Sequence, residues 1–143
     1  MKVYFSHPTF TYNTKTESRC IEIIKEAFKD SFESVDVINP SKFGLRINPV
    51  NKLKEADKIV GMAISDKMLY LVWKEIELAE NFEIEAYVFY VENKDDLGPL
   101  VEGVPKKIEK LSKDESRIFS NKMLKGKRDS FISSFIGNWG GRF

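Results

Sequence analysis

Residues 58–64 read Lys-Ile-Val-Gly-Met-Ala-Ile, a short segment that is apolar almost throughout instead of alternating between apolar and polar side chains. This pattern is typical of a strand at the centre of a parallel sheet, where both faces are covered. Residues 86–91, Ala-Tyr-Val-Phe-Tyr-Val, have the same character, and residues 2–6 and 35–39 are two further short segments rich in Val, Ile, Tyr or Phe. All four segments are predicted strands.

Segments with helical spacing lie between these strands. In residues 17–32, apolar side chains recur at the spacing of a helix that buries one face, and Thr14 or Thr16 can accept hydrogen bonds from its free first-turn amides. Residues 68–82 contain a second helical face, and residues 52–56 a short helix. Alternating strands and helices predict an α/β fold, a flavodoxin-like three-layer sandwich with a central, mostly parallel sheet.

The last third of the chain gives weaker patterns. Residues 93–105 are polar with Gly and Pro and predict a loop, residues 105–112 a short helix, residues 117–119 an edge strand, and residues 123–136 a helix. The sequence contains no internal repeat and no linker-like stretch, so one domain is expected over residues 1–143.

The composition excludes several classes of protein. Lys and Arg number 23 against 22 Asp and Glu, whereas domains that bind nucleic acid polymers usually carry a basic excess. No apolar run approaches the roughly 20 residues that span a bilayer, and the first residues show no signal-peptide pattern. A single cysteine fits a reducing compartment, and one Cys with one His does not provide the ligands of a structural zinc site. We expect a cytoplasmic protein that binds neither membranes nor metal.

Ligands of open parallel sheets bind beyond the carboxyl ends of the strands. Ser6 ends the first predicted strand and His7 follows it, so both are expected to contact a substrate, and Asp66 follows the third strand. The sequence lacks a Walker phosphate loop, a G-x-G-x-x-G dinucleotide motif and a G-x-S-x-G nucleophile elbow. Carboxylates are therefore the remaining chemical resource.

Two of these carboxylates, Glu75 and Glu77, lie on the helix predicted over residues 68–82. At about 100° per residue, with Val72 at zero, Ile76 lies near 40°, Glu75 near −60° and Glu77 near 140°. Glu75 is therefore placed at the flank of the buried stripe, from which it can reach a cleft at the rim of the sheet. Glu77 is expected to face water.

Several segments, in this order and spacing, resemble the nucleoside 2-deoxyribosyltransferase family. Residues 3–5, Val-Tyr-Phe, with Thr-Phe at residues 9–10, are similar to the opening strand of that family. Residues 56–60, Ala-Asp-Lys-Ile-Val, resemble its A-D-x-I-V segment, and residues 73–79, Trp-Lys-Glu-Ile-Glu-Leu-Ala, its helix with W-x-E or x-x-E-L-G-x-A. Residues 86–88 fall where its G-K-x-V strand begins. The opening Ser-His-Pro is that of a divergent branch.

The resemblance implies cleavage or transfer of the N-glycosidic bond of a (deoxy)nucleoside or nucleotide, without a metal or redox cofactor. Glu75 would be the nucleophile that forms a covalent glycosyl intermediate. Asp57 would be a second catalytic residue that handles the departing base, which needs a proton. Tyr4 would contact the nucleophile, and Asp66 would hold the sugar.

One departure from the family favours an alternative function. The family usually has a small, glycine-containing loop before the nucleophile, often D-S-G-T, whereas residues 66–72 here read Asp-Lys-Met-Leu-Tyr-Leu-Val. A bulky segment can narrow the pocket, and this favours a non-catalytic nucleotide-binding or sensing domain on the same fold. The candidate residues also have structural interpretations: Glu75 as an exposed helical glutamate, Asp57 as a partner of backbone amides at a strand entrance, Asp66 as a loop residue and His7 as a packed strand-end residue.

The family commonly forms oligomers with shared sites, so the resemblance also implies a homo-oligomer. Trp73 and the aromatic side chains of residues 138–143 are the expected apolar contacts of such an assembly.

Overall fold

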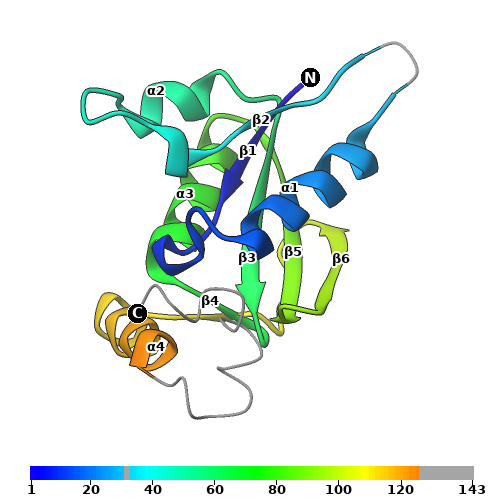
Figure 1. Cartoon of the computed structure of the whole chain (residues 1–143). Coiled ribbons are helices and arrows are strands. Elements are labelled where there is room, and N and C mark those ends of the chain that lie inside the picture. The colour runs from blue at the N-terminus through cyan, green and yellow to red at the C-terminus, as the bar shows by residue number, and fades with distance from the viewer. Residues whose placement is uncertain (31–32, 126–143) are drawn as a thin grey trace.

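The computed structural model describes residues 1–30 and 33–125 of the 143-residue chain. Four parallel strands form the centre of its sheet, in the order β2 (Asp36–Ile38), β1 (Lys2–Ser6), β3 (Lys58–Ile64) and β5 (Glu85–Asn93). The predicted α/β fold with a mostly parallel sheet is confirmed (Figure 1). The four central strands follow the order of flavodoxin-like sheets.

The strand β3 is the centre of this sheet, as its apolar sequence predicts. It pairs with β1 from Val3–Lys58 to Ser6–Gly61 and with β5 along its whole length, from Lys58–Glu85 to Ile64–Val91. Every residue of β3 after Lys58 is buried. A strand in this position has no edge exposed to water and no polar face, which explains its composition.

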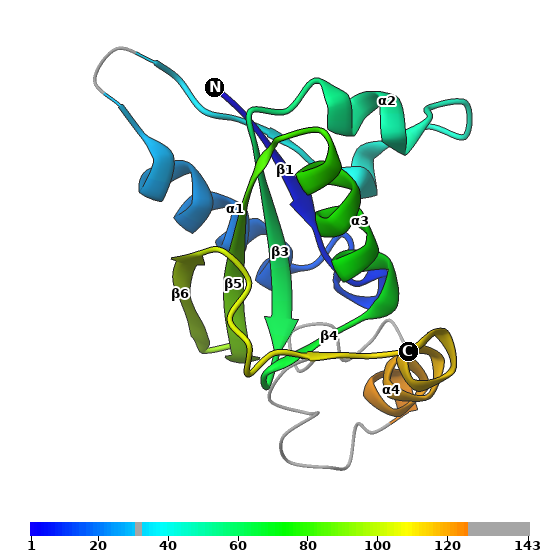
Figure 2. The same ribbon diagram turned by 180° about the vertical axis from the view of Figure 1, so that it is seen from behind.

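Helices cover both faces of the sheet. The helix α1 (Lys15–Phe28) lies on one face and α3 (Tyr70–Asn81) on the other, as the two opposite views show (Figures 1 and 2). The short α2 (Pro49–Lys54) lies near the amino ends of the central strands. Thr14 is the N-cap of α1, and its Oγ1 accepts from the Glu17 amide at 3.1 Å.

The remaining elements extend the sheet and cover its carboxyl edge. The strand β6 (Asp96–Glu102) pairs antiparallel with β5, and β4 (Lys67–Met68) follows β3 and pairs with β7 (Glu109–Lys110). The helix α4 (Lys113–Lys125) lies at this edge, near the end of β3 (Figure 1). Two 3-10 turns, η1 (Thr9–Thr11) and η2 (Pro40–Lys42), follow β1 and β2.

Three predictions for the last third of the chain are wrong. Residues 93–105 contain β6 instead of a loop, residues 105–112 contain β7 instead of a helix, and residues 117–119 belong to α4 instead of an edge strand. The β6 sequence misleads because none of the residues of this edge strand is fully buried, so it carries little apolar signal. The helix expected over residues 123–136 corresponds only to the end of α4, since residues 126–136 lie outside the described residues. No helix in the described ranges has the length and apolar character of a membrane span.

Candidate functional site

The centre of the site is the Glu75 carboxylate, which two hydroxyls of β1 hold from the sheet. The Tyr4 hydroxyl donates to Glu75 Oε2 at 2.5 Å, and Ser6 Oγ donates to Glu75 Oε1 at 2.7 Å. Alternate residues of a strand point to the same face, so both hydroxyls are directed at α3. Hydrogen bonds of this length to an ionised carboxylate are among the stronger ones in proteins.

A glycine in β3 brings α3 close enough for these contacts. Gly61 pairs with Ser6 across the sheet, and a Cβ built at Gly61 would lie 2.4 Å from Ile76 Cδ1 and 3.1 Å from Val72 Cγ1. Ile76 and Val72 are buried and fill the space that a side chain would need. The carboxylate of Glu75, next to Ile76 in α3, is thereby held at the level of Tyr4 and Ser6.

A cavity of about 370 Å³ opens beside Glu75 at the carboxyl edge of the sheet. Its volume falls in the range of small-molecule sites. Three parts of the chain form its wall: the turn after β1, the start of α3, and one side of α4. The lining residues are His7, Pro8, Thr9, Tyr12, residues 69–72, Glu75, Lys113, Ser116, Arg117 and Ser120.

Glu75 is the single carboxylate among these lining residues, and two tyrosines lie in its field. Burial, and then the charge of Glu75 and the hydrogen bond to it, raise the pKa of Tyr4 well above its ordinary value of 10.0. Burial followed by the charges of Glu75 and Glu17 raises the pKa of Tyr12 to about 12. Both phenols therefore keep their protons at neutral pH, and Tyr4 remains a donor to the carboxylate.

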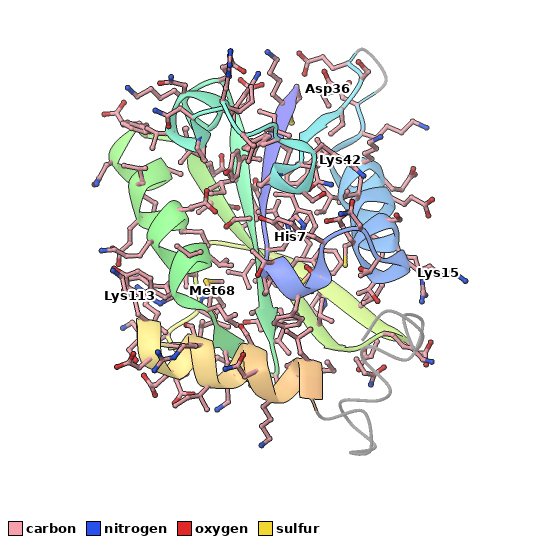
Figure 3. All side chains as sticks on the ribbon, turned by 60° about the vertical axis from the view of Figure 1, so that its left-hand side comes forward. His7, Lys15, Asp36, Lys42, Met68 and Lys113 are labelled. Atoms are coloured by element: carbon pink, nitrogen blue, oxygen red, sulfur yellow. The ribbon has the colours of Figure 1, made fainter. Side chains whose placement is uncertain are left out.

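His7 is part of the protein framework behind the cavity. Nδ1 of His7 donates to the Phe5 carbonyl at 2.8 Å, and Nε2 lies 2.7 Å from Oε2 of Glu17. Its ring stacks on the Phe5 ring with centroids 4.1 Å apart and packs against the Tyr12 ring with centroids 4.9 Å apart. Figure 3 shows the labelled His7 in the interior of the molecule, and its side chain is fully buried. Both ring nitrogens have partners within the protein, and His7 also lines the cavity, so its contact with a substrate stays a prediction.

Glu17 connects this framework to the neighbouring elements. Its Oε1 accepts from the Asn13 amide and from Ser41 Oγ, both at 3.2 Å. Burial would raise the pKa of the Glu17 carboxyl, but the hydrogen bond and charge of His7, with hydrogen bonds from Asn39 and Ser41, lower it overall. Glu17 is therefore held as a carboxylate that joins β1, α1 and η2.

The structure does not bring Asp57 or Asp66 to this cavity. The Asp57 Oδ2 atom accepts from the Lys2 amide at 2.8 Å, at the amino ends of β1 and β3. A residue before a parallel strand lies at the edge opposite to the cavity, so the geometry gives no support to the role in handling the base that the resemblance implies for Asp57. Asp66 occupies the turn between β3 and β4, where its half-exposed carboxylate pairs with Lys107 at 3.8 Å.

Glu77 lies on the other side of α3, as the helical spacing predicts. Its carboxylate pairs with Lys74 at 3.6 Å and Lys110 at 3.8 Å, and its side chain is 44% exposed. Trp73, expected at an intersubunit contact, is half-buried against the segment before α4, where its Nε1 donates to the Leu111 carbonyl at 2.8 Å. Residues 138–143 lie outside the described residues.

The α4 wall of the cavity is the part that sequence reasoning missed. Four residues of this wall have the i, i+3, i+4, i+7 spacing of one helix side: Lys113, Ser116, Arg117 and Ser120. This spacing is a signal that the sequence contains. Reading residues 117–119 as a strand breaks this pattern.

The site carries no sign of a metal centre in the described residues, where no group of three or more His, Cys, Asp or Glu is placed to hold an ion. No family model, curated protein or solved structure matches this chain.

Proposed function

We propose that the protein cleaves or transfers the N-glycosidic bond of a (deoxy)nucleoside or nucleotide, with Glu75 as the nucleophile. The observation that carries the proposal is the Glu75 carboxylate, fixed by Tyr4 and Ser6 at the wall of the 370 Å³ cavity. Nucleophiles of glycosyl transfer need a carboxylate that is ionised, oriented and open to a bound sugar. The resemblance of the first two-thirds of the chain to nucleoside 2-deoxyribosyltransferases points to the same chemistry.

The reaction begins with attack of a Glu75 oxygen on the anomeric carbon of the sugar. A C–O ester bond forms, the C–N glycosidic bond breaks, and the base leaves with the bonding electron pair and takes up a proton from water. Water or a second base then attacks the same carbon and releases Glu75 as a carboxylate. Tyr4 and Ser6 orient the carboxylate for attack and stabilise it again when the ester breaks.

A second candidate function is nucleotide binding without catalysis. The observation that favours it is the segment before α3, where Leu69, Tyr70 and Leu71 line the cavity in place of a small, glycine-containing turn. These side chains supply apolar contact area at the wall of the cavity. A protein of this kind would retain a nucleotide in the cavity and release no base.

The two functions differ in whether free base appears. Purified protein is incubated with pooled deoxynucleosides and deoxynucleoside 5′-monophosphates, and released base is measured by chromatography. Glu75→Gln keeps the size of the side chain but removes the attacking charge, and should lower the rate by several orders of magnitude. Glu77→Gln is the matched control, two residues further along on the outer side of α3, and should retain the wild-type rate. Binding without base release by the wild type would favour the sensing function.

We further propose that the chain forms a homo-oligomer, as the resemblance implies. Light scattering at micromolar concentration measures this directly. A monomeric mass would remove any site shared between subunits, and it would leave the Glu75 cavity as a complete site within one chain.

A further inference from the structure

The helix α4 gives the cavity a cationic side that the glycosidic chemistry alone does not require. Lys113, Ser116, Arg117 and Ser120 all line the cavity from this helix. Residues three, four and seven positions apart lie on one side of a helix, so their side chains form one continuous strip. This strip faces the same cavity as the Glu75 carboxylate, and it contributes two positive charges and two hydroxyls.

The helix is fixed in this position by contacts with two other elements. Ser116 Oγ accepts from the Tyr70 amide at 2.8 Å, at the first turn of α3. The Phe119 ring packs on Phe10 of η1 with centroids 6.4 Å apart, and Met123 is fully buried. The Lys113 side chain starts from the first turn of α4, close to the end of β4 (Figure 3). The cationic strip is therefore held over the cavity by packing.

The two cations have little to neutralise them within the protein. Among residues 1–30 and 33–125, Lys113 forms no ion pair, and its Nζ lies 5.3 Å from the centroid of the Tyr70 ring. Arg117 pairs with Asp114 at 3.4 Å, but both side chains are largely exposed, and such pairs on one helix contribute little. The carboxylate that lines the cavity, Glu75, already accepts hydrogen bonds from Tyr4 and Ser6.

We infer that Lys113 and Arg117 bind a phosphate monoester on the sugar of the substrate, so that the substrate class is a nucleoside monophosphate and not a neutral nucleoside. The inference rests on the proposed function and names the substrate of the same site. The guanidinium of Arg117 offers two parallel N–H groups to phosphate oxygens, and Lys113 adds a compact charge. Ser116 and Ser120 can donate further hydrogen bonds from the same strip. A neutral nucleoside would leave Lys113 without an ion pair and Arg117 with only its exposed pair to Asp114.

The test compares each deoxynucleoside 5′-monophosphate with the deoxynucleoside of the same base, using the full chain. The KM for the monophosphate should be at least tenfold lower than the KM for the nucleoside, because charge-assisted hydrogen bonds to the phosphate are made only there. Lys113→Gln and Arg117→Gln should each reduce the ratio of the nucleoside KM to the monophosphate KM about tenfold. Lys122→Gln removes a charge from an exposed position of α4 outside the cavity, and the ratio should stay at its wild-type value.

A second measurement keeps the inference separate from the proposed chemistry. Calorimetry with the Glu75→Gln variant measures binding of the monophosphate and of the nucleoside without turnover. We expect the Glu75→Gln variant to bind the monophosphate more strongly than the nucleoside. If this difference is lost when Lys113→Gln is added to Glu75→Gln, the inference is supported even if the wild type releases no base. Equal affinity for the two ligands, or base release with equal KM values that neither cation changes, would overturn it.

Discussion

Replacing Gly61 with Ala tests how the sheet positions Glu75. The added Cβ would meet Ile76 Cδ1 at 2.4 Å and Val72 Cγ1 at 3.1 Å, and these two side chains are buried. Overpacking of this kind costs about 1–3 kcal/mol. The lower chain entropy of alanine in the unfolded state returns about 0.4–1 kcal/mol. The net loss of unfolding free energy should therefore be about 0–2.6 kcal/mol, with a central value of about 1.3 kcal/mol.

A second substitution identifies the clash as the cause. Ile76→Val removes the Cδ1 atom that the new methyl group would strike, and alone it should cost about 0.5–1.5 kcal/mol. In the double variant the alanine methyl fills the space left by Cδ1, so the double variant should be about as stable as Ile76→Val alone. Gly44→Ala is the control, because a Cβ at Gly44 meets no atom within 4 Å.

Urea unfolding at 25 °C, followed by circular dichroism, gives the free energies of the four proteins and the control. Base release should fall in Gly61→Ala and recover in the double variant, since Glu75 is the neighbour of Ile76 in α3. If the two single losses simply add, within about 0.5 kcal/mol, close packing of α3 on Gly61 is not what positions the helix.

Three further predictions follow from the contacts of the site. Tyr4→Phe removes one of two donors to Glu75 and should slow base release about 10- to 100-fold, measured in single turnover, with the fold retained. The fold lowers the pKa of Glu17 below 4.5, so this carboxylate stabilises the protein above that pH and the stabilisation is lost as the pH falls through the lowered pKa. Urea midpoints of Glu17→Gln should therefore lie below those of the wild type at pH 7 and approach them towards pH 3, whereas a constant gap would contradict the lowered pKa of the Glu17 carboxylate. Alkaline titration by absorbance should show one phenol fewer titrating near pH 12 in Tyr12→Phe, and a loss near pH 10 would contradict its burial beside Glu75.

The sequence predicts the central sheet and the position of Glu75 well, for physical reasons. The strand of residues 58–64 is covered on both faces and must be apolar, so its composition reports its place. The position of Glu75 beside the buried stripe of α3 follows from helical geometry, and the hydroxyls of Tyr4 and Ser6 confirm that it faces the sheet. These features depend on local periodicity, which the sequence carries directly.

Features that depend on the path of the chain were harder to predict. Asp57 precedes a parallel strand, and its position alone puts it at the amino edge, where it binds the Lys2 amide. The family resemblance placed it at the site despite this. The α4 wall depends on a chain segment that crosses the carboxyl edge after β7, and nothing local in residues 105–112 indicates that path.

The most direct test of the central claim is to trap the covalent intermediate on Glu75. Fluorine at the sugar 2′ position of a nucleoside monophosphate destabilises the oxocarbenium-like transition state. It therefore slows formation of the glycosyl ester, and it slows release of the ester even more when water is the acceptor. The protein is mixed with this probe, and intact and peptide masses are measured. We expect one added glycosyl group on the peptide that contains Glu75, and none in Glu75→Gln. An unmodified protein after base release, or an adduct that persists in Glu75→Gln, would contradict the role of Glu75 as the nucleophile.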